Sequence, residues 1–223
     1  ANGRMGKALL PLLRASKKVE VVACTGKEDN LADAIKNSGA NIAIDFTTPQ
    51  SVFANAKTII NSKVHPIIGS SGLLTDQMAE LKQICAQNKL GGLIVPNFSI
   101  SALLMQHFAK QASHWFETAE IIERHHVAKK DAPSATALHC AKIIEPEMQQ
   151  QTEIHSQRLP GVFAEQQIVF ANPNEHLIIE QRALNRACML DGLILACEKV
   201  LKLDELQIGL EQFLFCNQTE TIT

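Results

Sequence analysis

The sequence predicts an α/β fold in which a doubly wound parallel sheet is joined to a smaller α+β domain. Three features predict it. Short apolar runs rich in β-branched residues alternate with amphipathic helical patterns as far as residue 95. Gly3 and Gly6 open the first helical pattern, as in a loop that approaches a dinucleotide. After Pro96 the alternation stops, and a long helical pattern precedes a region that mixes strands with one helix.

The elements of the first domain follow from hydrophobic periodicity. The first helix is expected from Arg4 to Ser16, with a bend or an early end at Pro11, which removes a backbone hydrogen bond. Val19 to Cys24 is rich in β-branched residues and predicts a buried parallel strand. The later strands are expected at 41–46, 64–68 and 92–95, and the later helices at 30–37, in a segment ending near 60, and at 75–88.

The change of rhythm also predicts the domain borders. We expect a dinucleotide-binding domain from residues 1–99 and 186–223, and a substrate domain from residues 100–185. The substrate domain contains predicted helices at 102–115 and 136–144, and a helix at 191–201 is expected to pack back on the first domain. A dinucleotide loop normally follows a buried strand, and none precedes Gly3. We therefore expect that the first strand is missing from this sequence and that the natural chain begins upstream.

Composition excludes several classes of function. With 223 residues and 46% hydrophobic content, the chain can bury one large core or two modest ones. A net charge of −2 and 4% aromatic residues without tyrosine do not suit nucleic acid binding. No apolar run reaches the roughly 18 residues that a membrane span needs. The six cysteines form no C-x-x-C pair and mostly lie in apolar stretches, which favours reduced thiols in a cytoplasmic protein.

The glycine loop and the segment after the second predicted strand suggest a cofactor. Gly3 and Gly6 would let the backbone approach a pyrophosphate, and Arg4 could add a phosphate contact, although an ordinary turn would use the same glycines. No acidic residue stands directly at the strand end, where a ribose ligand is expected. Lys27 could bind a 2′-phosphate and Glu28 ribose hydroxyls, and a solvated Lys27 is the alternative. The cofactor is therefore expected to be NADPH or NADH, with a slight preference for NADPH.

Residues 125–136, with the sequence HHVAKKDAPSAT, carry the strongest functional signal. Imidazole titrates near neutrality and transfers protons, and Lys129 adds positive charge. Ser134 is a natural N-cap, so the N–H groups that follow it, at Ala135 and Thr136, would face an anion. The combination predicts acid–base chemistry beside a carboxylate site.

Two other interpretations apply to the paired histidines. Adjacent side chains point in different directions, so only one of His125 and His126 is expected to face a given reactive atom, and both could be surface residues. A zinc site would need His139 and Cys140 as further ligands, but no recognised spacing links them.

This segment resembles the signature of the dihydrodipicolinate reductase family, E-x-H-H-x-x-K-x-D-A-P-S-G-T-A, with Ala135 in place of the family's glycine. Other matches follow in the family's order along nearly the whole chain. They are Asn2-Gly-Arg-Met-Gly6, Asp45-Phe-Thr-Thr-Pro49, Gly69-Ser-Ser-Gly72, Pro96-Asn-Phe-Ser99 and Ile154-His-Ser-Gln-Arg-Leu-Pro-Gly161. The resemblance implies a Rossmann-like nucleotide domain and a homotetramer built through second-domain sheets. It also implies reduction of a cyclic imine dicarboxylate to tetrahydrodipicolinate by NAD(P)H, in lysine biosynthesis.

The resemblance further implies roles for single residues. His125 matches the proton donor or acceptor, and Lys129 matches a second donor. Substrate contacts are expected at His126, Ser134, Ala135 and Thr136. Cofactor contacts are expected at Ala1, Asn2, Gly3, Arg4, Met5, Lys27, Gly69, Ser70, Ser71, Val95, Pro96, Asn97 and Phe98, and no metal is expected. Arg158 could line the pocket or be structural, and Arg186 corresponds to a family arginine near the hinge, so both are weaker candidates for the site.

Ala135 and two rival functions remain to be weighed. If its position needs a positive φ, alanine there is strained by roughly 1 kcal/mol, whereas on the first turn of a helix it fits well, and we favour the helix. One rival function is a different two-domain enzyme, such as a relative of aspartate or homoserine dehydrogenase. The other is a nucleotide-sensing or scaffold protein without catalysis, against which the presence of His125 and Lys129 speaks.

Overall fold

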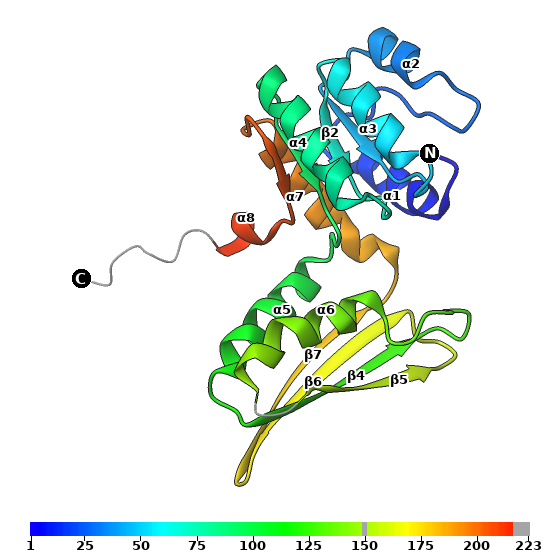
Figure 1. Cartoon of the computed structure of the whole chain (residues 1–223). Helices are drawn as coiled ribbons and strands as arrows, with labels where there is room; N and C mark the ends of the chain where they lie inside the picture. The colour runs from blue at the N-terminus through cyan, green and yellow to red at the C-terminus, as the bar shows by residue number, and fades with distance from the viewer. Residues whose placement is uncertain (149–150, 216–223) are drawn as a thin grey trace. The chain divides into compact units, whose positions relative to one another are not determined.

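The computed structural model describes residues 1–148 and 151–215, and the predicted C-terminal part of the first domain at 216–223 lies outside them. The chain forms two compact units (Figure 1). Unit 1 contains residues 1–98 and the chain from Met189 onward, and unit 2 contains Ser99–Cys188. The α/β fold class predicted from the sequence is confirmed: one unit has a parallel sheet between helices, and the other has a mixed sheet with helices on one face.

Unit 1 is built on a parallel four-stranded sheet in the order β1-β2-β3-β8. The strands are β1 (Ile42–Asp45), β2 (His65–Ile68), β3 (Gly92–Ile94) and β8 (Leu206–Ile208). The helices are α1 (Arg4–Ala15), α2 (Leu31–Ser38), α3 (Val52–Asn61), α4 (Thr75–Asn88), α7 (Leu190–Val200) and α8 (Glu211–Phe215). Helices α3 and α4 cover one face of the sheet, and α7 with α1 covers the other (Figure 1).

Burial on both faces explains the apolar strands of this sheet. Ile67, Ile68 and Leu93 are each fully buried, which is typical of a parallel sheet between two helical layers. Each such side chain stabilises the fold by about 1.5–3 kcal/mol. Helix α7 lies so close to the chain at Phe98 that a Cβ at Gly192 would be 2.0 Å from the Phe98 carbonyl oxygen. Glycine at position 192 allows this close approach. The helix predicted at 191–201 therefore does pack on the first unit.

For the start of the chain, one predicted strand is corrected and one of the two alternatives for Pro11, an early end of the helix, is excluded. Residues 19–24 form no strand, and Val22 is 49% exposed. β-Branched residues favour extended backbone, but a strand also needs a hydrogen-bonded neighbour, and no part of the described chain pairs with this segment. Pro11 does not end α1, which continues to Ala15. The Pro11 ring fixes a helical φ, so the chain loses one hydrogen bond there without leaving the helix.

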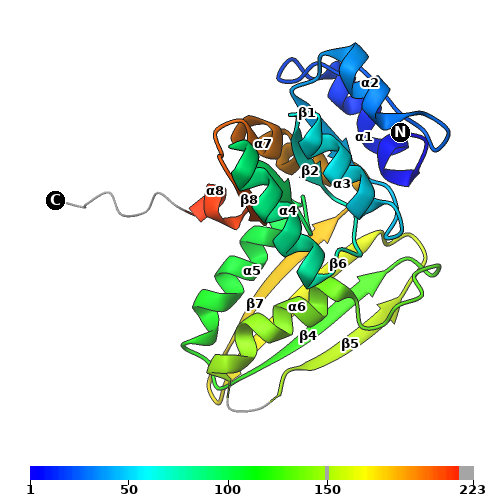
Figure 2. The ribbon, with the colours of Figure 1, turned by 45° about the horizontal axis from the view of Figure 1, so that its top comes forward.

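Unit 2 is a mixed four-stranded sheet in the order β5-β4-β6-β7. The strands are β4 (Thr118–His125), β5 (Glu153–Arg158), β6 (Ala164–Asn172) and β7 (Glu175–Ala183), and only the β4–β5 pair is parallel. Two 3₁₀ helices, η1 (Glu145–Glu147) and η2 (Arg186–Met189), lie after α6 and β7. Helices α5 (Ile100–Ser113) and α6 (Ala135–Ile144) cover one face of the sheet (Figure 2). Among the described residues, no helix covers its other face.

The α-helical face of this sheet changes from apolar to polar in successive rows. An apolar row of four isoleucines crosses all strands in register: Ile154, Ile121, Ile168 and Ile179. The next row on the same face is polar and contains Ser156, Glu123, Gln166 and Gln181. The row after that contains Arg158, His125, Ala164 and Ala183. Because side chains on one face of a strand recur every second residue, β4 contributes both to the core and to the polar end of the sheet.

Candidate active site

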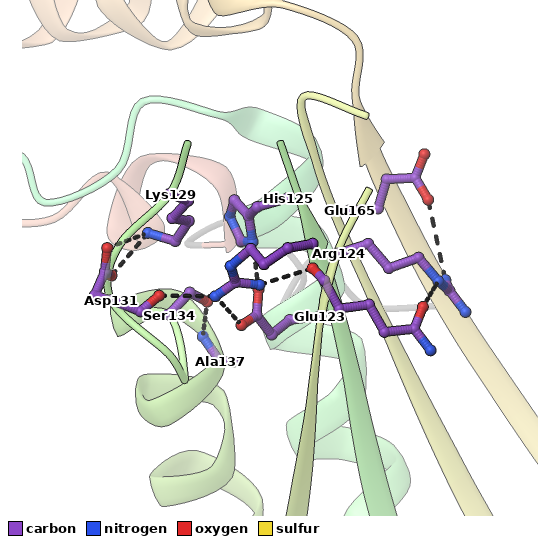
Figure 3. A network of polar contacts seen from close by, with 10 residues as sticks. Glu123, Arg124, His125, Lys129, Asp131, Ser134, Ala137 and Glu165 are labelled. Carbon is purple, nitrogen blue, oxygen red and sulfur yellow. Dashed lines mark hydrogen bonds and ion pairs between the residues drawn. The ribbon is translucent and has the colours of Figure 1, made fainter. Parts of the chain in front are cut away.

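A buried carboxylate organises the polar end of unit 2. The Glu123 side chain is fully buried, and its two oxygens have different partners. His125 Nδ1 hydrogen bonds to Oε2, and Arg158 Nη2 donates to Oε1 at 2.9 Å (Figure 3). Burial alone would raise the pKa of Glu123, but hydrogen bonds from Arg158, Ser156 and His125 outweigh it and hold that pKa below the ordinary value. The carboxylate is therefore ionised at neutral pH.

The same network sets the charge of His125, whose side chain is 16% exposed. Burial lowers the pKa of His125, the hydrogen bond and the charge of Glu123 raise it, and the Lys129 and Arg158 charges lower it again. The net result is a pKa below the ordinary 6.5. At neutral pH the ring is mainly neutral, with Nδ1 held against Glu123.

Lys129 and Asp131 form the second part of the site. Lys129 Nζ donates to both Asp131 oxygens, at 2.9 and 2.7 Å, and the pKa of Asp131 is lowered by this hydrogen bond. Arg158 Nη2 also donates to the Asp131 carbonyl oxygen at 2.7 Å, which ties this loop to the sheet. Figure 3 shows Lys129 and His125 on the same side of the network, above the start of α6.

Helix α6 begins where the sequence predicted a carboxylate site. Ser134 is its N-cap, and the Ser134 hydroxyl oxygen accepts from Ala137 N at 3.2 Å. Ala135 is the first helical residue and is not among the described residues with positive φ, so alanine fits here without strain. Within the described chain, the N–H groups of Ala135 and Thr136 have no acceptor. Two donors at a helix N-terminus are suited to a carboxylate.

The neighbouring histidine has a different environment. His126 stacks on Phe163, with ring centroids 6.5 Å apart, and Arg186 lies over the same ring, 5.3 Å from its centroid. As expected for adjacent residues, the two histidines have separate partners. The predicted substrate contacts at His126 and Ser134 both follow His125 in the chain and lie in the same unit.

In unit 1, the predicted cofactor residues gather at the start of α1 and at the carboxyl ends of the strands. Gly3 is the N-cap of α1, and a Cβ at Gly6 would lie 2.0 Å from the Ala1 carbonyl oxygen, so the loop needs glycine there. Asn2, Arg4 and Met5 belong to the same turn. The Ala1 amino group donates to the Thr25 carbonyl oxygen. Such a close-packed glycine turn at a helix N-terminus fits a pyrophosphate.

The loop after β2 also packs too tightly for a side chain. A Cβ at Gly69 would lie 2.2 Å from the Phe46 ring and 2.8 Å from Phe98, and these two rings meet edge to face. Ser70 Oγ donates to the buried carboxylate of Asp45, which also accepts from Thr47 and Asn55. The structure thus brings Gly69, Ser70 and Phe98 together.

Most of the other predicted cofactor residues are close in sequence to these positions, and Lys27 lies apart from them. Ser71 follows Ser70, and Val95, Pro96 and Asn97 follow β3, with Val95 N donating to Ile68 O at 2.8 Å. Lys27 is exposed in the turn at 26–29, where Gly26 N donates to Asp29 Oδ2 at 2.6 Å.

The described residues contain no group of three or more histidine, cysteine, aspartate or glutamate side chains arranged to hold a metal ion. No helix among them is both long and apolar enough to cross a membrane.

One unit has a parallel sheet of the nucleotide-binding type, and the other has an imidazole, an ammonium group and a helix N-terminus with unpaired N–H groups. These features define a class of protein, the two-domain pyridine-nucleotide-dependent oxidoreductases. Comparisons with known proteins identify the family. Models for the N-terminal and C-terminal parts of dihydrodipicolinate reductase match residues 1–98 and 101–214. The chain belongs to the dihydrodipicolinate reductase family.

Individual relatives agree over nearly the full length. The 4-hydroxy-tetrahydrodipicolinate reductase of Coxiella burnetii is 43% identical, with 96% of each chain covered. That of Legionella pneumophila strain Paris is 40% identical, with the same coverage. Dihydrodipicolinate reductase from Paenisporosarcina sp. TG-14, with bound dipicolinate, is similar in structure, with a TM-score of 0.85 and 28% identity over 95% of this chain and 96% of that one.

Family membership establishes the reaction. The chain is an NAD(P)H-dependent reductase of a cyclic imine in lysine and diaminopimelate biosynthesis. This excludes the aspartate or homoserine dehydrogenase alternative and the non-catalytic one.

Sequence reasoning missed one residue of the site. Glu123 stands in the motif but was not assigned a role, although its place on the strand carried a signal. It follows Ala119 and Ile121 on an inward-facing alternation, where an ionisable residue is rare unless it has a partner.

Proposed function

We propose that His125 and Lys129 carry the acid–base chemistry of this reductase, and that the start of α6 binds one carboxylate of a dicarboxylate substrate. The bound relative supports the substrate class, because dipicolinate is a ring compound with two carboxylates. The main observation behind this proposal is that unit 2 brings together His125, the Lys129 ammonium group and the unpaired N–H groups of Ala135 and Thr136.

The chemistry divides between cofactor and protein. A bound reduced nicotinamide supplies the hydride. Reduction of the imine also takes up one proton, which the charged form of His125 donates from Nε2, since Nδ1–H is already hydrogen bonded to Glu123. Lys129 leaves Asp131 to pair with a substrate carboxylate or to stabilise developing charge. His126 and Ser134 shape the site around the substrate.

We propose that the cofactor is held at Gly3, Gly69 and Phe98, together with the other predicted contacts. The backbone is close-packed at Gly69 and at Gly6 beside Gly3, where a side-chain Cβ would not fit. Lys27, exposed in the turn after residue 25, favours NADPH over NADH by pairing with a 2′-phosphate.

We also infer a homotetramer in the cytoplasm. The face of the second sheet that carries Ile122 and Ile178 has no helix over it among the described residues, and Ile178 is 55% exposed. A second copy of the sheet would cover it. The buried cysteines Cys85, Cys140 and Cys197 are free thiols, which suits a reducing compartment.

The roles of His125 and Lys129 are tested by steady-state kinetics on the full chain. His125→Gln should lower kcat by about 10²- to 10⁴-fold with little change in cofactor affinity. Lys129→Ala should both raise the KM for the imine and lower kcat. Lys130→Ala is the matched control, because Lys130 is exposed and adjacent, and it should behave as the unmodified protein. Unchanged kinetics in His125→Gln or Lys129→Ala would remove that residue from the mechanism.

A further inference from the structure

We infer that Glu123 is a positioning residue for proton transfer: it holds the Nδ1–H of His125, so that Nε2 is the only ring nitrogen that exchanges a proton with the substrate. This inference rests on the proposed role of His125. Glu123 does not touch the reacting atoms, since its side chain is fully buried beneath the histidine.

The geometry leaves Glu123 one mode of action. Arg158 Nη2 donates to Oε1 at 2.9 Å, which keeps the carboxylate ionised, and an ionised carboxylate can only accept hydrogen bonds. Its bond with His125 Nδ1 therefore requires a proton on Nδ1. In the neutral ring the lone pair is then on Nε2, and in the charged ring Nε2 carries the second proton. In both the neutral and the charged ring, Nε2 is therefore the nitrogen that can exchange a proton with the substrate.

The charges around the ring also point to Glu123. The ionisable groups that act on His125 are Glu123 from β4, Lys129 and Asp131 from the following loop, and Arg158 from β5. Two of them are cations that disfavour a charged imidazole, and Asp131 is already paired with Lys129. Glu123 is the carboxylate in direct contact with the ring, so it alone among these groups both orients the imidazole and offsets its positive charge.

A buried ion pair with Arg158 could have a purely structural role, because such pairs contribute little net stability but are costly to break. The two roles differ in their effect on proton transfer. A structural pair would change the free energy of unfolding when it is broken, without moving the pH dependence of the reaction. A positioning residue changes that pH dependence and the position of the ring proton.

The kinetic test compares Glu123→Gln, Glu123→Asp and Glu147→Gln in the full chain. Glu123→Gln should lower kcat roughly 10²-fold and move the limb of the kcat/KM profile that depends on His125 to lower pH by about 1–3 units. Glu123→Asp, which keeps the charge, should return the limb toward its original pH. Glu147→Gln is the matched control, because it removes the carboxylate of another histidine pair, His114–Glu147 at 3.3 Å, and should change neither. An unmoved limb in a folded Glu123→Gln protein would overturn the inference.

The second test needs no variant and so does not depend on folding. Nitrogen chemical shifts of isotopically labelled histidine in the unmodified chain should place the proton of neutral His125 on Nδ1. A neutral ring protonated on Nε2 would contradict the inference. If His125→Gln retains full activity, the proposed function fails. If His125→Gln is inactive while Glu123→Gln has normal kinetics, only the inference about Glu123 fails.

Discussion

At the residue scale, a single strand serves the core and the site. Ile121 lies in the isoleucine row, Glu123 in the polar row and His125 at the end, all on one face of β4. The first step of two residues leads from an apolar layer to an ionisable side chain, the second leads to another, and both ionisable side chains remain mostly buried. Burial lowers the pKa of His125 and would raise that of Glu123, but hydrogen bonds from Arg158, Ser156 and His125 hold the pKa of Glu123 below its ordinary value.

These shifts predict how stability depends on pH. The pKa of His125 is below 6.5 in the folded protein, and that of Glu123 is below 4.5. In both cases the unfolded chain binds protons more readily, so stability is greatest above the unfolded pKa and falls as pH drops toward the folded one. Urea denaturation should show the free energy of unfolding declining below about pH 6.5 and again below about pH 4.5. The decline below about pH 6.5 should be weaker in His125→Gln. It should be unchanged in His139→Gln, the control, because His139 is exposed. Equal declines in the unmodified protein and both variants would exclude His125 as the cause.

The proposed preference for NADPH also rests on a single residue, Lys27. Lys27→Ala should raise the KM for NADPH by about tenfold or more and leave that for NADH nearly unchanged, because a charge-assisted hydrogen bond contributes about 1.5–3 kcal/mol. Lys36→Ala, on the last turn of α2, provides a lysine control in the same unit. Equal changes in the KM for NADPH and the KM for NADH would show that Lys27 does not contact the 2′-phosphate and is only solvated.

At the element scale, the N-terminus of α6 links the stability of the helix to the proposed binding of a carboxylate. The Ser134 hydroxyl caps the helix through Ala137 N, while the N–H groups of Ala135 and Thr136 stay available for an anion. Cap and ligand thus use different donors of the same turn. A frayed first turn would leave the cap unmade and the carboxylate site misaligned.

Ser134→Ala should therefore have two effects. It should lower the free energy of unfolding by about 1 kcal/mol and raise the KM for the imine severalfold. Asn30→Ala is the matched control: Asn30 caps α2 by accepting from Asp33 N at 3.2 Å, the same distance as in the Ser134 cap. It should cost similar stability and leave the KM for the imine unchanged. Chemical denaturation and steady-state kinetics on both variants distinguish a capping effect from a general loss of stability.

At the scale of the whole molecule, the described helices cover one face of the second sheet and leave the other face open. On the open face, Arg124 donates to Gln157 at 2.8 Å and to Gln167 at 3.2 Å and lies 3.7 Å from Glu180. Val169 and Ile178 pair in register beside this polar cluster. A face that combines exposed apolar side chains with ordered polar groups is typical of an interface between copies of a chain.

If this face forms the tetramer, Ile178→Glu should shift the protein to smaller species, because it would place a charge in an apolar contact. Light scattering coupled to size-exclusion chromatography measures the change. Trp115→Glu, which alters a more exposed side chain at the end of α5, should leave the mass unchanged. A tetramer that persists in Ile178→Glu would place the interface elsewhere.

The site residues that could be predicted from sequence lie close together along the chain. His125, Lys129 and Ser134 fall within one segment whose order follows from local chemistry, a strand end, a turn and an N-cap. The pair that organises them could not be predicted in the same way. Glu123 and Arg158 are 35 residues apart, and their contact depends on the register of two parallel strands.

The sequence by itself determined the fold class, most of the helices and the reaction family, because hydrophobic period and short motifs are local properties of the chain. Only the tertiary structure decided whether an extended segment becomes a strand and which charges meet. Residues 19–24 have the composition of a strand but no hydrogen-bonded neighbour in the described chain. Glu123 stays ionised because folding brings Arg158 to a carboxylate whose pKa burial alone would raise.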